Sequence, residues 1–127
     1  MKAIMLVFLG AGLGGVARHL VNLGCARACG TQFPYGTLTV NVVGSLLMGL
    51  IAGWLAFRSS AGWSQDVRLL LTTGVLGGFT TFSAFSLDAM LLFERGETGL
   101  AALYVLGSVM FSIAALAAGL ALVRALA

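Results

Sequence analysis

The sequence predicts an all-α membrane protein with four transmembrane helices in a single domain over residues 1–127. Composition gives the first indication, because 60% of the residues are hydrophobic and 9% are charged, whereas a soluble domain carries roughly 25% charged residues. The second indication is four apolar runs, each near or above the roughly 20 residues that cross a hydrocarbon core. Short joints that contain Gly, Pro or charged residues separate these runs. We therefore expect almost no part of the chain to lie outside the bilayer.

The four expected spans cover residues 3–23, 35–57, 67–93 and 100–123. The first apolar run contains one charged residue, Arg18, and the apolar centres of the other three contain none. A cleaved signal peptide is the alternative for the first run. Such a peptide has a shorter apolar stretch and a small-residue cleavage site followed by a soluble domain. Neither feature is visible, so we expect the first run to be a true span.

Small and polar residues recur at four-residue spacing along the first two spans. They are Gly10 with Gly14 and Ala11 with Gly15 in the first span, and Asn41, Ser45, Gly49 and Gly53 in the second. Small side chains let helix backbones approach closely in lipid, where the hydrophobic effect does not drive helices together. A chain this short cannot enclose a wide lumen, so we expect any pathway to lie between helices or between subunits.

The third span carries the strongest local signal, which is for an interrupted helix. Its centre reads Gly77-Gly78-Phe79-Thr80-Thr81, a poor sequence for a helix interior. The middle of a span over residues 67–93 falls at Phe79 and Thr80, so we expect a break near the membrane midplane. Broken helices leave unpaired carbonyls and amides that can hold ions at this depth.

Polar and aromatic side chains within the spans are the candidate functional groups, because polar groups are costly in hydrocarbon. They are Arg18, about 22 Å along the first span, then Thr37 and Asn41, then Phe79, Phe82 and Phe85, and finally Tyr104, Ser108 and Ser112. Ser and Thr hydroxyls can alternatively bond to a carbonyl one turn back. The Phe residues are either a packing stripe or the lining of an anion passage, since ring edges carry positive partial charge. No Asp or Glu falls within the polar stripes to repel an anion.

Charges are few and almost balanced between the two membrane sides. One side would carry Lys2, Arg58, Arg68 and Arg124, and the other Arg27 and Arg95, with Arg18 if its side chain extends that way. This excess is too small for the positive-inside rule to fix one orientation, so one weakly preferred orientation and insertion both ways up are both open. The scattered net charge of +3 argues against a nucleic-acid partner. Cys25 and Cys29 lack further metal ligands, and no catalytic pair is visible, so we do not expect an enzyme.

Three segments resemble the Fluc (CrcB-type) fluoride channel family, and the resemblance extends over essentially the whole chain. They are Gly14-Gly15-Val16-Ala17-Arg18, Gly36-Thr37-Leu38-Thr39-Val40-Asn41-Val42-Val43-Gly44 and Gly77-Gly78-Phe79-Thr80-Thr81-Phe82-Ser83-Ala84-Phe85. The third segment is highly specific. Ala84 departs from the family pattern, where a Thr is frequent, and His19 stands where an aromatic residue is usual.

The resemblance implies an antiparallel, dual-topology homodimer with two fluoride pores and one central structural sodium ion. Gly77 and Thr80 of both subunits would donate carbonyls to the sodium ion, Phe82 and Phe85 would line the pore, and Asn41 would donate a hydrogen bond to fluoride. Supporting positions in a vestibule or polar track would be Arg18, Thr37, Ser83, Tyr104, Ser108 and Ser112. The expected activity is passive exit of cytoplasmic fluoride across a bacterial inner membrane, which lowers its toxicity.

Two other classes of function remain open from the residues alone. A small proton-coupled drug exporter also has four short spans and balanced charges, but its chemistry needs a titratable carboxylate within a span. The first span has none, and Asp88 is expected near the end of the third. A non-transporting subunit of a membrane complex is the other class. Fluoride flux from purified protein in liposomes would separate both from a channel.

Overall fold

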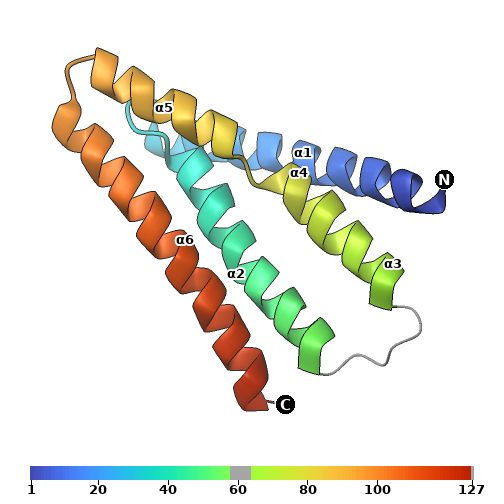
Figure 1. Cartoon of the computed structure of the whole chain (residues 1–127). Coiled ribbons are helices and arrows are strands. Elements are labelled where there is room, and N and C mark those ends of the chain that lie inside the picture. The colour runs from blue at the N-terminus through green and yellow to red at the C-terminus, as the bar shows by residue number, and fades with distance from the viewer. Residues whose placement is uncertain (58–63, 127) are drawn as a thin grey trace.

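The computed structural model describes residues 1–57 and 64–126 (Figure 1). Over these residues, four helical stretches are long and apolar enough to cross a membrane: Lys2–Cys29, Tyr35–Phe57, Gln65–Glu94 and Thr98–Leu126. The prediction of an all-α membrane protein with four spans is confirmed. Arg58, which enters the predicted charge balance, lies in the joint outside the described residues.

Three of the spans are single helices: α1 (Lys2–Cys29), α2 (Tyr35–Phe57) and α6 (Thr98–Leu126). α1 continues past the expected end at residue 23, because no Pro interrupts the segment that follows. It ends at Gly30, where φ is +81°, a conformation that favours glycine after a helix C-terminus. α2 then begins directly after Pro34. Gly96, with φ of +82°, makes the turn that precedes α6.

The third span consists of several segments with an interruption between them. It runs through α3 (Ser64–Arg68), the π-helix η1 (Leu69–Leu76) and the short α4 (Gly77–Phe79). Thr80 and Thr81 are then extended, and α5 (Phe82–Glu94) completes the span. The predicted break is confirmed. It lies at Thr80 and Thr81, slightly later than expected, because the Thr80 N–H still donates to the Leu76 carbonyl at 2.9 Å.

Close glycine contacts hold the helices in two pairs (Figure 1). α1 packs on η1 and α4, where a Cβ added at Gly10 would lie 2.7 Å from the carbonyl oxygen of Leu70. α6 packs along α2, where a Cβ at Gly119 would lie 2.7 Å from the carbonyl oxygen of Leu46. Only glycine permits these approaches, as expected for helices that associate in lipid. Gly15, in contrast, has open space beside its Cα.

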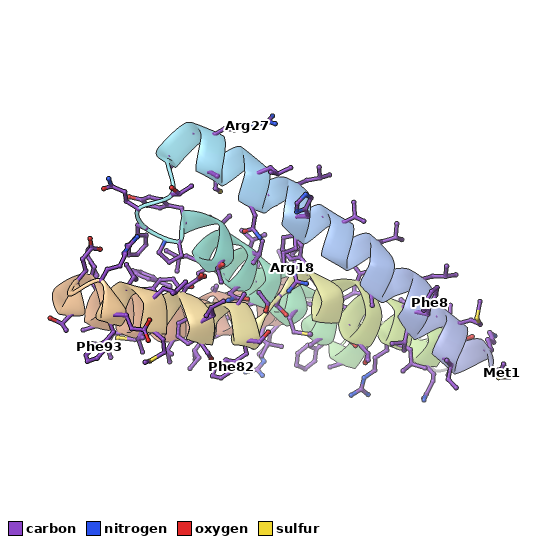
Figure 2. All side chains as sticks on the ribbon, turned by 90° about the horizontal axis from the view of Figure 1, so that it is seen from above. Met1, Phe8, Arg18, Arg27, Phe82 and Phe93 are labelled. Atoms are coloured by element: carbon purple, nitrogen blue, oxygen red, sulfur yellow. The ribbon has the colours of Figure 1, made fainter. Side chains whose placement is uncertain are left out.

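Most large apolar side chains point outward from the bundle (Figure 2). Phe8 on α1 is 70% exposed and Met110 on α6 is 68% exposed. The buried cluster is small and consists of Phe85, Leu92, Ala101 and Tyr104. Helices that are apolar on all sides are typical of membrane spans, because lipid solvates their outer faces.

Candidate functional site

A side chain from α2 holds the break in the third span. Asn41 Nδ2 donates to the Thr81 carbonyl oxygen at 3.0 Å, and the Thr81 N–H donates to Asn41 Oδ1 at 2.8 Å. The extended Thr81 therefore exchanges both of its backbone hydrogen bonds with one amide. Because Nδ2 carries two N–H groups, Asn41 keeps one donor beyond the bond to Thr81.

The break also deprives the carbonyl oxygens before it of their helical partners, among them those of Gly77 and Thr80. In an uninterrupted α-helix, the Gly77 carbonyl would accept from the Thr81 N–H, and the Thr80 carbonyl from the Ala84 N–H. Here the Thr81 N–H donates to Asn41, and the Ala84 N–H donates to Thr81 Oγ1 at 3.1 Å as the N-cap of α5. The Gly77 and Thr80 carbonyls are thereby released in the middle of the span. Unpaired carbonyl oxygens are ligands that hard cations accept.

A cavity of about 460 Å³ lies beside the break, between α2, α5 and α6. Of the predicted pore residues, Asn41, Phe82, Phe85, Ser108 and Ser112 line it. The lining is completed by Thr80 and Thr81 at the break, by Gly44, Ser45 and Met48 on α2, and by Val109, Ile113 and Leu116 on α6. None of these lining residues is charged. The cavity therefore collects neutral hydrogen-bonding groups from three helices.

Ser108 is a buried polar residue in this lining without an internal partner. The hydroxyls of Thr39, Thr72, Thr80 and Ser86 each donate to a carbonyl one turn back, as the self-capping alternative predicts. Ser108 is only 5% exposed, and its hydroxyl has no hydrogen-bond partner among the described residues. Because buried hydroxyls are nearly always paired, this one indicates a water or an ion in the cavity.

Aromatic rings continue from the cavity toward the membrane surface. The ring centroids of Phe82 and Phe85 are 5.5 Å apart, those of Phe85 and Tyr104 are 5.2 Å apart, and those of Tyr104 and Phe33 are 5.5 Å apart. Phe82 is 78% exposed, whereas Phe85 is 8% exposed. Phe79 approaches Gly44 instead and does not line the cavity. In one copy, Phe79 therefore has a packing role alone, and Phe85 both packs in the buried cluster and lines the cavity. Phe82 lines the cavity and is mostly exposed.

Tyr104 and Thr37 form a polar cluster next to the cavity. Both residues are buried; the Tyr104 hydroxyl lies beside Thr37 and donates to Asp88 Oδ2 at 3.3 Å. Asp88 lies near the end of the third span, as expected, because the span ends at Glu94. It is outside the cavity lining, but it contacts Tyr104 of the polar stripe on α6, a contact that the sequence analysis did not anticipate. Asp88 continues the three-residue spacing of Phe82 and Phe85, and this register is the sequence signal that could have found it.

Arg18 and Ser83 stand apart from the cavity lining. Arg18 is half-buried and points from α1 toward the interior of the bundle, whereas Arg27 points away from it (Figure 2). The Ser83 hydroxyl is exposed and lies 3.3 Å from Thr81 Oγ1 at the start of α5. The structure therefore brings Ser83 to the break and leaves Arg18 on a neighbouring helix.

The two cysteines lie at the end of α1, away from this site. Cys25 Sγ lies 3.9 Å from Thr39 Oγ1 as a weak hydrogen bond, and Cys29 is exposed. Within the described part of the chain, no group of three or more His, Cys, Asp or Glu side chains could hold a metal ion.

One family profile matches most of the chain. It is described as CrcB-like protein, Camphor Resistance (CrcB), and the match covers residues 5–120. The chain belongs to the CrcB-like family. The resemblance noted in the three sequence segments is thereby confirmed, and every residue that lines the cavity falls within the matched range.

Members of this family that are similar to the chain carry names of ion channels. A protein of Nitrobacter hamburgensis named fluoride-specific ion channel FluC 2 is 65% identical over 120 residues, which is 94% of this chain and 95% of that protein. The fluoride-specific ion channel FluC of Rhodopseudomonas palustris strain BisB5 is 65% identical over 96% of this chain and 97% of its own length. A protein of the same name from Granulibacter bethesdensis is 53% identical over 99% and 98%. These names describe no enzyme, in agreement with the expectation for this chain.

Proposed function

We propose that this chain is a fluoride-selective channel through which cytoplasmic fluoride leaves the cell passively. The observation that carries the proposal is the uncharged cavity beside the break, in which Ser108 has no partner and Asn41 keeps a free N–H. The Nitrobacter and Rhodopseudomonas relatives are named fluoride-specific ion channels. The chemistry of the cavity and the names of the relatives therefore agree on a small anion.

Neutral donors suit the conduction of a strongly hydrated anion. Fluoride can leave bulk water only where protein donors replace its hydration shell, and the Asn41 amide and the Ser108 and Ser112 hydroxyls are such donors. The ring edges of Phe82 and Phe85 add positive partial charge without a full charge. An ion held by neutral groups can move on, whereas one bound at a buried fixed cation would be retained.

A second copy in antiparallel orientation would complete the pathway. Phe82 lines the cavity and is nevertheless 78% exposed, so the cavity wall is unfinished at this ring in one copy. The weak charge bias permits both orientations in the membrane. A two-fold axis in the membrane plane would then bring the breaks of both copies together at the midplane and give two equivalent pathways.

The central sodium ion would be held by the Gly77 and Thr80 carbonyls of both copies. These residues fit the role, because the hydrogen bonds of Asn41 and Thr81 divert the amides that would otherwise occupy both oxygens. Four carbonyls from two copies would provide a site for a hard monovalent cation without any charged side chain. The bound ion would supply a fixed positive charge between the two pathways.

Passive exit is useful to a cell because fluoride enters as the neutral acid and dissociates at cytoplasmic pH. A channel in the bacterial inner membrane would let the trapped anion leave down its gradient and would lower its toxicity. Asn41, Ser108 and Ser112 would need only to replace water along the way, and no reaction is required of the protein.

The proposal is tested by efflux from liposomes that contain only the purified protein. Vesicles loaded with fluoride or with chloride are diluted into a solution free of both ions, and each released anion is measured with a selective electrode. Rapid fluoride release with chloride retained is the expected result. A folded protein that releases neither ion, or both at equal rates, contradicts the proposal.

A further inference from the structure

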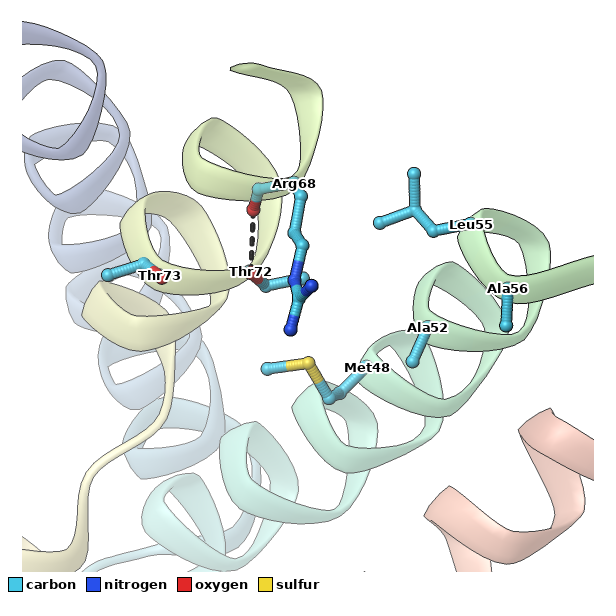
Figure 3. Close-up of a pocket in the computed structure, with 7 residues that line it drawn as sticks. All are labelled: Met48, Ala52, Leu55, Ala56, Arg68, Thr72 and Thr73. Atoms are coloured by element: carbon cyan, nitrogen blue, oxygen red, sulfur yellow. Dashed lines mark hydrogen bonds between the residues drawn. The ribbon is translucent and has the colours of Figure 1, made fainter. Parts of the chain in front are cut away.

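A second cavity, of about 470 Å³, lies between the C-terminal half of α2 and η1. Met48 and Ala52 form one wall of it, and Thr72 and Thr73 contribute from η1 (Figure 3). Arg68, at the junction of α3 and η1, extends its guanidinium between the two helices (Figure 3). Arg68 is the charged residue in this lining, and no carboxylate accompanies it.

The Arg68 guanidinium has no acidic partner among the described residues. The nearest acidic residue in the sequence, Asp66, forms an ion pair with Lys2 at 2.6 Å. The Arg68 carbonyl accepts the Thr72 hydroxyl at 2.6 Å. This bond fixes the residue at the start of η1 and leaves the side chain's donors without a partner among residues 1–57 and 64–126. Arginine stays protonated at any physiological pH, so the cavity carries a permanent positive charge.

This second cavity adjoins the cavity beside the break at one side chain. Met48 lines both of them. Asn41, Ser45, Met48 and Ala52 follow one another on one face of α2 at spacings of three and four residues. An ion that enters beside Arg68 would therefore meet the Asn41 and Ser45 side chains next, once it has passed Met48.

We infer that Arg68 is an anion-collecting residue, and that the cavity between α2 and η1 is a water-filled mouth of the pathway. The inference rests on the proposed function and names the residue that brings small, hard, monovalent anions to it. A cleft with low-dielectric walls and one sign of charge focuses the field and raises the local concentration of counter-ions. Because Arg68 is exposed, the anion keeps most of its water there and is passed on without being trapped.

A structural role for Arg68 makes different predictions. If the guanidinium only anchors the span at the interface, replacing Arg68 would impair folding. If it binds a lipid phosphate, the effect of replacing it would depend on lipid composition. A collecting residue changes the concentration of fluoride at which flux is half-maximal and leaves the maximal flux nearly unchanged. Its influence also weakens as salt screens the charge.

The test measures fluoride flux against fluoride concentration for Arg68→Gln and for Arg124→Gln in the reconstituted dimer. Arg124 is the matched control, because it lies on the same side of the expected topology and stacks on the Phe57 ring, 5.4 Å from its centroid, outside both cavities. Each variant removes one positive charge and so changes the topological bias equally. Arg68→Gln should raise the half-saturating fluoride concentration about tenfold at low ionic strength, whereas Arg124→Gln should leave it unchanged.

A cysteine variant supplies an independent measurement. In a background with Cys25→Ser and Cys29→Ser, Arg68→Cys should react with water-soluble thiosulfonates. A cationic reagent should restore the low half-saturating concentration, and an anionic reagent should raise it further. Lack of reaction in a folded dimer would show that the cavity is closed to water and would overturn the inference.

The remaining outcomes separate this inference from the function on which it rests. Equal half-saturating concentrations in Arg68→Gln and Arg124→Gln, with normal wild-type flux, reject only the role of Arg68. If Arg68→Gln changes flux in anionic vesicles but not in zwitterionic vesicles at the same fluoride concentration, Arg68 binds lipid headgroups. That result also rejects its role as an anion-collecting residue. Absence of flux in the wild-type protein rejects the channel itself.

Discussion

Asn41 and Thr81 are separated by 40 positions in the sequence, yet they exchange two hydrogen bonds, of 3.0 and 2.8 Å, at the break in the third span. The same amide lines the cavity beside the break. One side chain therefore both fixes the extended backbone and offers a donor to the proposed ion. The shape of the break and the chemistry of the pathway are coupled through it.

The change Asn41→Asp is expected to lower fluoride flux by about 100-fold or more, because it removes a donor and adds a negative charge where the anion passes. The carboxylate can still accept from the Thr81 N–H, but it faces the Thr81 carbonyl without a proton to donate. The dimer should nevertheless form. Flux in liposomes and size-exclusion chromatography measure the two effects.

The matched control for this variant is Asn22→Asp on α1. Asn22 is also half-buried, and it lies beside Gly36 and not in the cavity lining. It should keep most of the wild-type flux. Wild-type flux in a folded Asn41→Asp protein, or an equal loss in both variants, would contradict the role of Asn41 as a donor to fluoride.

The break itself could be predicted from residues 77–81, because two glycines followed by two threonines disfavour a helix wherever they occur. Its partner could not. Asn41 shows in the sequence only as a lone amide, and its bonds to Thr81 depend on how α2 packs against the third span. Ser108 could not be distinguished from Ser86 in the sequence either. Only the structure shows that the Ser108 hydroxyl is buried without a partner among the described residues, whereas the Ser86 hydroxyl bonds to the Phe82 carbonyl.

Two features were missed for different reasons. Asp88 was placed correctly near the end of the third span, but its contact with Tyr104 was missed, although its register with Phe85 indicated it. The π-helix η1 has no simple sequence signature, and it lies where α1 comes close, with Gly10 beside the Leu70 carbonyl. Position along a span is thus readable from composition, whereas local helix geometry is set by tertiary contacts.

Removal of the Ser108 hydroxyl should affect flux more than removal of a self-bonded hydroxyl. Ser108→Ala deletes a buried donor that has no internal partner, and the expected loss of fluoride flux is about tenfold. Ser86→Ala is the control, because the Ser86 hydroxyl is exposed and donates to the Phe82 carbonyl at 2.9 Å. Equal flux in the two variants would assign Ser108 to packing alone.

The aromatic pair can be separated by stability. Phe82→Ile and Phe85→Ile keep apolar bulk but remove the ring edges, so both should lose fluoride flux per folded dimer. Phe85→Ile should also be destabilised, by about 1 kcal/mol, because Phe85 is buried while Phe82 is exposed. Thermal unfolding in detergent measures this difference. Normal fluoride flux in both variants would show that the two rings contribute to packing and not to conduction.

Removal of sodium tests the cation site that the Gly77 and Thr80 carbonyls would form. Protein exchanged into N-methylglucamine should lose flux, because four carbonyl oxygens without a cation repel one another at the proposed dimer centre. Millimolar sodium should restore flux, and choline, which is too large for a carbonyl site, should not. Full flux after exhaustive exchange, when atomic emission detects no residual sodium, would show that the channel does not need the ion.

Orientation gives the last prediction, because the antiparallel dimer requires both topologies to be populated. Single cysteine labels at the N-terminus, in a background with Cys25→Ser and Cys29→Ser, should react from both sides of the membrane in comparable amounts. Two or three lysines added at one end should push the chain into one orientation and abolish flux, because no antiparallel partner is then available. Co-expression with a copy biased the opposite way should restore it. Labelling from one side only, or conduction by a biased copy alone, would exclude the antiparallel arrangement. The sodium site would fall with it, since the four carbonyls of Gly77 and Thr80 meet only if a two-fold axis in the membrane plane relates the two breaks.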